Sequence, residues 1–408
     1  MPHLLKNPAN MNVAETDFGA QVGIREDILA MTTEGRSAPS GPRGRVTLAE
    51  VSDMLGLSKG TVSRALNGYP DIAEGTRLRV RTVAERMGYR PLSQAQGIRT
   101  GRTRSIGLVL QTDEHDSHAP FLTDFLAGVT TTASREDWTL TVATAASDAD
   151  MAETLRRLVA ERKADGFILP RTLVHDPRIE TLESLGVPFV LFGRTGSTAP
   201  LASFDIRGEA AMQEAVQRLA RLGHRRIGFV GGAERYMFAQ LRLTGYRSGL
   251  SAAGLPFDAA LVRTGTRTTA DGEAATIDLL TQPAPPTAIV FATDITALGA
   301  YAVAERLGLR IGYHLSVISY DGISAGGLMR PPLTTYRVDT RGAGARLAEL
   351  LIRQIRGERP EKLRELAPAE FVAGGSDAPP AATSEALAAT VAQSLKNQET
   401  VSIREEPR

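Results

Sequence analysis

The side chains of this 408-residue chain that are best suited to binding chemistry lie in two places. One is the short stretch "LSKGTVSRALNG", residues 57–68, in which small hydroxyls, a Lys, an Arg and an Asn outnumber the apolar residues. Such side chains offer hydrogen bonds and positive charge, which phosphates and the edges of purine bases accept. The other is a set of Arg and Asp residues that directly follow apolar runs later in the chain. The first place indicates contact with a nucleic acid and the second a small-molecule site.

The basic charge of the chain is unevenly distributed. The formal net charge is only +1, yet residues 43–104 hold twelve Lys and Arg against five Asp and Glu. This local excess of seven positive charges is an electrostatic footprint suited to a polyanion, although a merely solvated basic surface would look the same. The binding partner that the charge favours is double-stranded DNA.

Several classes of function are disfavoured. The chain has no Cys, which excludes disulfides and Cys-based metal sites or nucleophiles. It has no apolar run long enough to span a bilayer and no secretory signal at its start, so we expect a cytoplasmic protein with no membrane contact. Dinucleotide, Walker and nucleophile-elbow motifs are missing as well, so we expect no enzyme activity and no cofactor.

Residues 45–90 contain helical patterns and no strand-like run. Thr47 and Glu50 have the spacing of a capping box at the start of one helix, Gly56 ends it, and Ser58 caps a second helix. Apolar positions in both helices are spaced to face each other: Leu48, Val51, Met54 and Leu55 in the first, and Val62, Ala65 and Leu66 in the second. Two short helices joined by a Gly-containing turn form a helix-turn-helix, the alternative being a surface helical hairpin.

A third helix is expected to follow and to complete a small core. Asp71 and Glu74 have capping-box spacing at its start, and Gly88 ends it. In a helix-turn-helix the second helix enters the major groove of DNA, while neighbouring residues hold the phosphates. For Thr76 and Arg77, ordinary capping and solvation is the alternative to phosphate contact. The residues expected at the DNA are Thr47, Ser58, Lys59, Gly60, Thr61, Ser63, Arg64, Asn67, Thr76 and Arg77.

Residues 105–375 alternate apolar β-type runs with amphipathic helices. The runs are 105–110, 140–145, 166–170, 188–193, 226–232, 288–294 and 315–322, and helical segments include 151–162, 208–222, 241–253 and 296–307. This alternation predicts an α/β fold with parallel sheets covered on both faces, and so many strands favour two doubly wound subdomains. Ligands in such folds bind outside the carboxyl ends of the strands, so the residues after each run are the candidate site.

The segment "VTLAEVSDMLGLSKGTVSRALNGYPDIAEGTRLRVRTVAERMGYRP" resembles the DNA-binding domain of the lactose-repressor (LacI/GalR) family of bacterial transcription regulators. The resemblance continues more loosely to about residue 373, through "RTGRTRSIGLVL", "RLTGYRSGL", "ATDITALGAYAVAERLGLRI" and "LSVISYDG". It implies a helix-turn-helix headpiece, a hinge at residues 91–104, and two subdomains of periplasmic-binding-protein type. It also implies a homodimer that reads a roughly two-fold operator and responds to a small effector.

This chain departs from the family pattern at a few positions. Ser52 replaces the usual Ala, Ala73 replaces a capping hydroxyl, and the hinge reads "SQAQGIRTG". Ile98 stands where the family inserts a Leu between base steps of the minor groove, and Ile is also able to act as such a wedge. Gly97 weakens a hinge helix by about 1 kcal/mol relative to Ala.

The candidate ligand residues combine position and resemblance. Arg194, Asp294 and Asp321 end or follow apolar runs, Arg242 matches a family Arg that bonds the effector, and Phe121 matches an aromatic or apolar effector contact. Arg and Asp pairs suit vicinal sugar hydroxyls, although structural ion pairs and, for Phe121, core packing are the alternatives. For Asp205, the two interpretations are a place in the cleft and the cap of a helix. Asp113 belongs to an acidic and His-containing loop with Glu114, His115, Asp116 and His118, for which we favour a polar lip of the pocket over a merely solvated loop or a metal site.

The sequence as a whole predicts a DNA-binding transcriptional regulator, in the usual case a repressor, controlled by a sugar. The alternatives are the same role with a nucleobase or other metabolite as effector, or a non-catalytic sugar-binding protein. Residues 1–44 and 376–408 are expected to be a disordered extension and a disordered tail.

Overall fold

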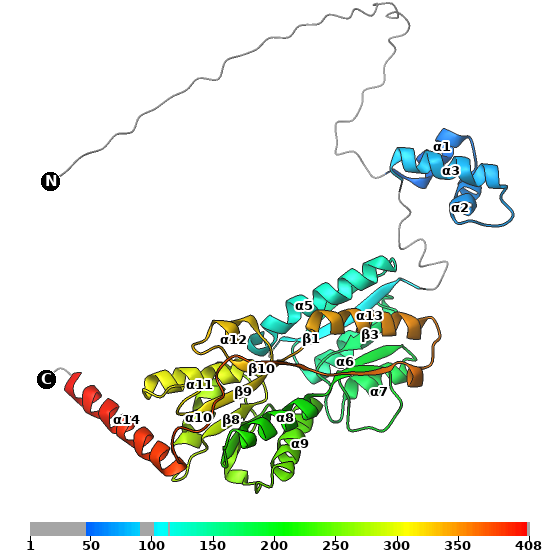
Figure 1. Cartoon of the computed structure of the whole chain (residues 1–408). Helices are drawn as coiled ribbons and strands as arrows, with labels where there is room; N and C mark the ends of the chain where they lie inside the picture. The colour runs from blue at the N-terminus through cyan, green and yellow to red at the C-terminus, as the bar shows by residue number, and fades with distance from the viewer. Residues whose placement is uncertain (1–45, 90–101, 113–114, 406–408) are drawn as a thin grey trace, which may run out of the picture. The chain divides into compact units, whose positions relative to one another are not determined.

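The computed structural model describes residues 46–89, 102–112 and 115–405, and its compact units divide after Arg90 (Figure 1). The expectations for residues 1–44 and for hinge residues 91–101, including Ile98, lie outside the described residues. Asp113 and Glu114 lie outside them too.

The first unit is a three-helix headpiece made of α1 (Leu48–Leu55), α2 (Lys59–Leu66) and α3 (Glu74–Met87). Its core is small and dry, with the side chains of Val51, Val62, Ala65 and Val80 fully buried. Thr47 and Glu50 form the expected capping box on α1, Ser58 accepts the Thr61 amide at the start of α2, and Gly56 is left-handed at φ 64°. These local signals hold two short helices in the helix-turn-helix geometry.

Two expectations for the headpiece are wrong. Met54, assigned to the apolar face of α1, is 67% exposed. The box between Asp71 and Glu74 is not formed, because the N-cap of α3 is Ala73, which has no side chain able to cap. Ser52, by contrast, is accommodated in the interior by donating its hydroxyl to the Leu48 carbonyl at 2.7 Å.

The second unit holds two six-stranded sheets. The first has the order β11-β5-β4-β3-β1-β2, and every neighbouring pair is parallel. Its strand order reverses at β1, so the carboxyl ends beside β1 and β3 form a switch point where ligands bind in doubly wound folds. Its strands are β1 (Ser105–Gln111), β2 (Thr139–Ala145), β3 (Gly166–Leu169), β4 (Phe189–Phe192), β5 (Ser203–Ile206) and β11 (Arg364–Ala367).

The second sheet has the order β12-β10-β9-β8-β6-β7 and is parallel except for the pair β10 and β12. Its order reverses at β6, which repeats the plan of the first sheet. The predicted fold of two doubly wound subdomains is therefore confirmed. The strands are β6 (Ile227–Val230), β7 (Val262–Arg263), β8 (Ala288–Phe291), β9 (Ser316–Asp321), β10 (Thr334–Arg337) and β12 (Glu370–Val372).

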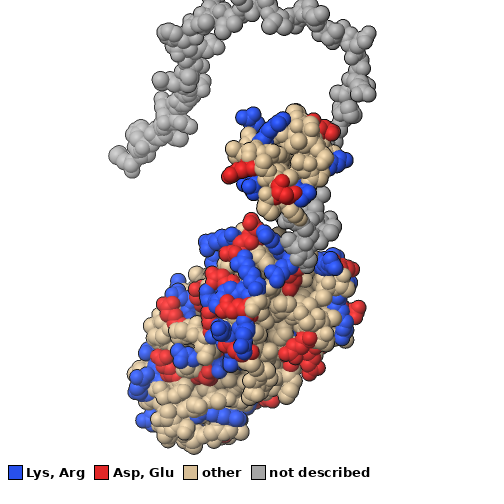
Figure 2. All heavy atoms as spheres, turned by 90° about the vertical axis from the view of Figure 1, so that its right-hand side faces the viewer, with Lys and Arg blue, Asp and Glu red and all other residues tan. Residues whose placement is uncertain are grey.

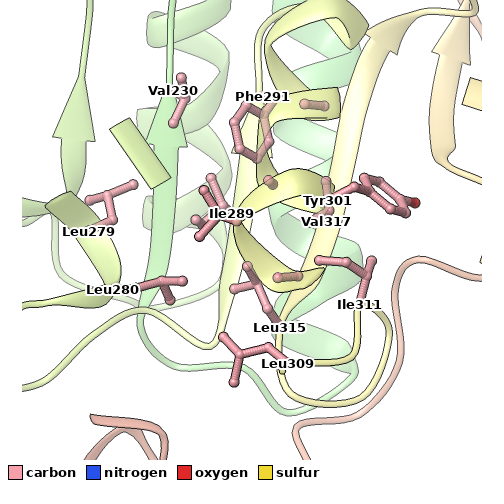
Figure 3. Packing of buried hydrophobic residues seen from close by; sticks show 14 of the residues in the cluster. Val230, Leu279, Leu280, Ile289, Phe291, Tyr301, Leu309, Ile311, Leu315 and Val317 are labelled. Carbon is pink, nitrogen blue, oxygen red and sulfur yellow. The ribbon is translucent and has the colours of Figure 1, made fainter. Parts of the chain in front are cut away.

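Helices cover both faces of each sheet, so the central strands are apolar on both sides. In β8, the Ile289 and Phe291 side chains pack against the helices of one face, α10 and α11 (Figure 3). The Ala288 and Val290 side chains pack against α8 and α9 on the other face. This burial on both faces explains why such strands appear as continuous apolar runs. The helices are α5 (His115–Arg135), α6 (Asp148–Ala160), α7 (Pro177–Ser184) and α13 (Thr340–Ile355) on the first sheet, and α8 (Gly208–Arg221), α9 (Met237–Ala252), α10 (Thr269–Leu280), α11 (Asp294–Arg306) and α12 (Ser324–Leu328) in the second subdomain.

The chain crosses between the subdomains three times, after β5, after β10 and after β11. The three strands before these crossings, together with β7 and β12, were not among the predicted runs. They are two to four residues long; β10 ("TTYR") is mostly polar and β11 ("RELA") is half polar. Short strands at crossings and edges lack the apolar run that identifies a buried central strand.

The expected disorder after residue 375 is not what the structure has. Ser376 is fully buried and donates its hydroxyl to the Val317 carbonyl, and helix α14 (Ser384–Glu405) follows. Leu387 and Val391 of α14 are 2% exposed and pack on the core beside α11. The second unit therefore extends well beyond residue 375, because an apolar stripe too short for a coiled coil is long enough to dock on an existing core.

Candidate functional site

The polar face of α2 is presented at the surface of the headpiece. Lys59, Gly60 and Arg64 are exposed, and Thr61 and Ser63 are half-buried, while Val62 and Ala65 anchor the opposite face. Of the other residues expected at the DNA, Thr47 and Ser58 are exposed and Asn67, Thr76 and Arg77 are half-buried. Every one of these ten side chains or backbone positions is thus open to a partner, and none is needed for the apolar core.

The hydroxyls of α2 are ordered by local contacts. The Ser58 and Thr61 hydroxyl oxygens lie 2.9 Å apart at the N-terminus of the helix, where backbone amides and the helix dipole favour an anion such as phosphate. At the other end, the Asn67 side-chain amide donates to the Ser63 carbonyl at 2.6 Å. These side chains are pre-oriented, so less entropy would be lost when they bind a partner.

A cleft of about 1040 Å³ lies between the two subdomains. It is lined by residues at the carboxyl ends of strands in both sheets, as the doubly wound topology requires. The lining brings together four of the six residues expected to bind a ligand, Phe121, Arg194, Arg242 and Asp321, and it also includes Asp205.

Arg242, on α9, is the most constrained cation in the cleft. Its guanidinium is sandwiched between aromatic rings, 3.9 Å from the centre of Tyr320 and 4.8 Å from the centre of Phe238. Its Nη1 donates to the Ala292 carbonyl at 2.6 Å, whereas its buried Nε has no hydrogen-bond partner within the described residues. Because Nε is buried, a ligand oxygen would meet the guanidinium at the part that lines the cleft, beside Asp321.

Asp321 is the acceptor that faces Arg242. Its Oδ1 lies 3.8 Å from Arg242 Nη2, and about a third of its side chain (36%) remains exposed in the cleft. Burial raises the pKa of Asp321 to about 7, against the opposing effect of the Arg242 guanidinium. The residue has a φ of 123°, an unusual conformation outside glycine that places strain at the site. A carboxyl with such a pKa is able to accept or donate a hydrogen bond near neutral pH.

Arg194 joins the two subdomains by ion pairs. It follows β4 and donates from Nε to Asp205 at the end of β5, and from Nη2 to both carboxylate oxygens of Glu209 on α8, each at 2.8 Å. Asp205 accepts the amide of its neighbour Ile206, and burial raises its pKa against the effect of Arg194. Asp205 therefore lies at the cleft, and it does not cap α8, whose N-cap is Arg207.

Asp294 differs from the expectation for it. Its side chain is fully buried and absent from the cleft lining. One oxygen accepts the hydroxyls of Ser319 and Thr335, and the other accepts the amides of Gly322 and Ile323 at 2.7 and 2.8 Å. Its acceptor capacity is used by the protein, so Asp294 positions the loop after β9 and does not reach a ligand.

Phe121 belongs both to the cleft and to an aromatic stack. Its ring centre lies 5.0 Å from Phe125 and 5.7 Å from Phe192, and Phe192 also lines the cleft. Phe125 is fully buried, whereas Phe121 is only half-buried. Phe121 thus packs against Phe125 and Phe192 and also borders the cleft, so core packing and contact with an effector are compatible.

Other cleft residues were missed by sequence reasoning. Arg171 follows β3 as Arg194 follows β4, so the carboxyl-end rule would have found it. Its guanidinium stacks on Tyr236 at 4.7 Å, and beside it the amide of Met237 donates to the Thr172 carbonyl at 3.0 Å, a hydrogen bond between subdomains. Tyr320 and Phe238, which also line the cleft, carried no comparable signal.

The acidic and His-containing segment is not a loop throughout, because α5 begins at His115. Within the described ranges, no group of three or more His, Asp or Glu is arranged to hold a metal ion. In the same part of the chain, no helix is both long and apolar enough to cross a membrane.

A helix-turn-helix headpiece in one chain with a two-subdomain binding core defines a DNA-binding protein that senses a small molecule. Comparison with known proteins agrees. Residues 47–92 match the family described as bacterial regulatory proteins, lacI family, and residues 103–373 match the periplasmic binding proteins and sugar binding domain of LacI family. The chain belongs to the LacI family and is a DNA-binding transcriptional regulator; the family consists of non-enzymatic regulators.

Individual relatives align over nearly their whole length. The HTH-type transcriptional regulator AglR of Rhizobium meliloti (strain 1021) is 36% identical, covering 82% of this chain and 95% of the relative. The transcriptional regulator CelR–cellobiose complex is 30% identical with a TM-score of 0.64, covering 81% of this chain and all of that one. The lac repressor dimer bound to operator and the anti-inducer ONPF, at 24% identity and a TM-score of 0.71, shows the same fold over 82% of this chain.

Proposed function

We propose that this regulator is a homodimeric repressor whose affinity for its operator is controlled by a neutral sugar bound between the two subdomains. The observation that carries the proposal is the Arg242 site, where the Arg242 guanidinium, stacked on the Tyr320 ring, lies beside the Asp321 carboxyl in a cleft of about 1040 Å³. Because operator DNA is in the cytoplasm of a bacterium, the protein is placed there.

The charges of the cleft support a neutral ligand over an anion. Cations and carboxylates are nearly balanced in its lining, and several are paired, such as Arg194 with Asp205 and Arg337 with Glu370. Paired charges offer donors and acceptors side by side without a net field, which suits a polyol. The lining cations are Arg171, Arg194, Arg242, Arg267, Arg337 and Arg341, and the carboxylates are Asp124, Asp205, Asp321, Asp339 and Glu370.

The shape and apolar parts of the cleft support a sugar larger than one ring. Phe121 and Phe192 line one side and Phe238 the other, so aromatic side chains border the cleft where the C–H faces of sugar rings could pack. The volume exceeds the usual range for a compact ligand site. A related regulator has been solved as a complex with cellobiose, a disaccharide.

The coupling between cleft and operator follows from thermodynamics. Arg194 and Glu209 belong to different subdomains, and the chain crosses between the subdomains beside the cleft, so ligand binding biases their relative arrangement. Whatever factor the sugar applies to operator affinity, the operator applies to sugar affinity. The hinge residues 91–104 are the connection by which the headpiece responds.

The proposal is tested by a thermal-shift screen of the full chain against mono- and disaccharides, nucleosides and nucleobases. The expected result is a rise in melting temperature with a disaccharide, absent in Arg242→Ala. A rise with purines or nucleosides alone would replace the sugar by the alternative effector class. An operator selected from random duplexes must then lose affinity when the active sugar is added; unchanged affinity would leave a sugar-binding protein without the regulatory coupling.

A further inference from the structure

The end of the recognition helix carries a charge pair that the DNA-binding role of α2 does not by itself explain. The Arg64 guanidinium donates from Nη2 to the Asp71 carboxylate, seven residues later in the chain. It also lies 5.4 Å from the centre of the Tyr69 ring. Both charged side chains are close to half exposed, at 52% for Arg64 and 45% for Asp71.

The backbone holds Asp71 in place. Gly68 is left-handed at φ 70°, and the Tyr69 amide donates to the Arg64 carbonyl at 3.1 Å, which turns the chain back over the end of α2. The Ile72 amide then donates to the Tyr69 carbonyl at 3.2 Å, and the Ile72 side chain packs on the headpiece core. Asp71 is thus fixed between a helix end and a core residue.

Asp71 has no other assignment in the headpiece. It does not cap α3, which begins after Ala73 without a side-chain cap. A carboxylate on a surface that approaches DNA repels the phosphates, and Figure 2 shows acidic as well as basic side chains on the visible face of this unit. Its contact with Arg64 is therefore the feature that explains its position.

We propose that Asp71 is a positioning residue that orients Arg64 for reading one base of the operator and so sharpens selectivity. The inference rests on the proposed contact of Arg64 with a base. A guanidinium has five donors in a planar fork, and a guanine takes two of them, at O6 and N7. Because Arg64 Nη2 donates to Asp71 and the Tyr69 ring restricts the plane of the guanidinium, the Arg64 side chain already has fewer rotamers before it binds DNA. The carboxylate also lowers the attraction for phosphates in general.

Two opposite effects follow from removing this carboxylate. Affinity for the operator should fall because Arg64 becomes mobile, and affinity for unrelated DNA should rise because one negative charge is gone. An exposed ion pair of this kind contributes little to stability, so the fold should be unaffected. A purely structural role would change neither base preference nor the balance of the two affinities.

The experiment compares Asp71→Asn with Asp53→Asn in the full chain. Asp53 is an exposed acidic residue on α1, so its change removes the same charge without touching Arg64. An operator is selected from random duplexes with the wild-type chain, and affinities are measured for it, for its single-base-pair variants and for unrelated DNA. We expect Asp71→Asn to reduce the ratio of specific to non-specific affinity about three- to tenfold, mainly at the base pair that Arg64→Ala also affects.

Each outcome decides the matter. If Arg64→Ala removes the preference at one base pair and Asp71→Asn leaves that preference as Asp53→Asn does, the positioning role is refuted while the DNA contact stands. If Arg64→Ala changes no base preference, the base contact itself is wrong, and the inference about Asp71 falls with it.

Discussion

The headpiece and the ligand cleft assign their functional side chains in opposite ways. In the headpiece, most of the residues expected at the DNA lie within α2 and its flanks, at the surface, and the core beneath consists of separate residues such as Val62. In the cleft, Arg194, Arg242 and Asp321 come from different elements and are already engaged by protein atoms. A local motif thus serves a large external partner, whereas a long-range assembly surrounds a small one.

If this contrast is correct, the largest effect on stability comes from the buried hydrogen-bond network around Asp294 and not from the headpiece. We expect Asp294→Ala to lower the free energy of unfolding of the core by about 3–5 kcal/mol, because four donors lose their acceptor in the interior. Chemical denaturation measures the change. Met54→Ala, at an exposed headpiece position, is the control and should alter stability by less than about 0.5 kcal/mol. An Asp294→Ala protein as stable as wild type would show that the buried network has no such role.

The second prediction separates the two functions from the side of the headpiece. Arg64→Ala should weaken operator binding by about 100-fold or more, since each recognition helix of a dimer loses a base contact of about 1–3 kcal/mol. Sugar binding should not change. Fluorescence anisotropy with the selected operator gives the first quantity and calorimetry the second. Arg86→Ala, at the end of α3, is a matched loss of charge; an equal effect there would mean that Arg64 contributes only general attraction.

The third prediction separates them from the side of the cleft. Arg242→Ala should weaken the sugar about 10- to 100-fold, because the buried guanidinium supplies a charged hydrogen bond, and should leave operator affinity without sugar unchanged. The sugar should then no longer release the operator. Arg306→Ala, in an ion pair with Glu273, is the control. A normal response in Arg242→Ala would place the effector elsewhere.

The smallest expected effect is a pH dependence of sugar affinity. The free Asp321 carboxyl has a pKa of about 7, raised from its ordinary value, so the folded core holds a proton there that the unfolded chain releases at lower pH. Its contribution to stability therefore declines as the pH rises from about 4 to 7. A sugar hydroxyl that donates to the ionised carboxylate lowers this pKa, so affinity should rise a few-fold between pH 6 and 8. Calorimetry at pH 6 and pH 8 measures the sugar affinity, with Asp321→Asn as the control. An affinity that does not change with pH would mean that Asp321 does not accept a hydrogen bond from the sugar.

Local signals made the headpiece largely predictable. The capping box of Thr47 and Glu50, the left-handed Gly56 and the Ser58 cap each depend on residues within one turn, so spacing alone identifies them. The same kind of spacing was misleading at Asp71, because α3 begins only after Ala73 and the Asp71 carboxylate pairs with Arg64 instead. Met54 is a further case, because its position in the helical repeat predicted a place on the apolar face of α1 but its side chain is exposed.

In the core, the central strands were predictable and the crossings were not. β8 and β9 are buried on both faces and appear as apolar runs, whereas β10 and β11 are short, polar and placed by pairing with distant partners. Asp294 and Asp321 occupy equivalent positions at carboxyl ends of strands, yet one is enclosed by Ser319 and Thr335 and the other faces the cleft. α14 was missed because its three apolar positions acquire meaning only beside the surface they cover.

The sequence by itself determined the helix-turn-helix, the doubly wound order of strands and helices, and the set of residues at strand ends, because these depend on period, caps and turns within short windows. Tertiary structure decided which of those residues share a cleft and that Arg64 is held by Asp71. It also decided that the Asp294 carboxylate accepts hydrogen bonds only from the protein itself and does not reach the cleft. The physical reason is that a side chain's hydrogen bonds and solvation depend on neighbours brought together by folding, which no short window of sequence contains.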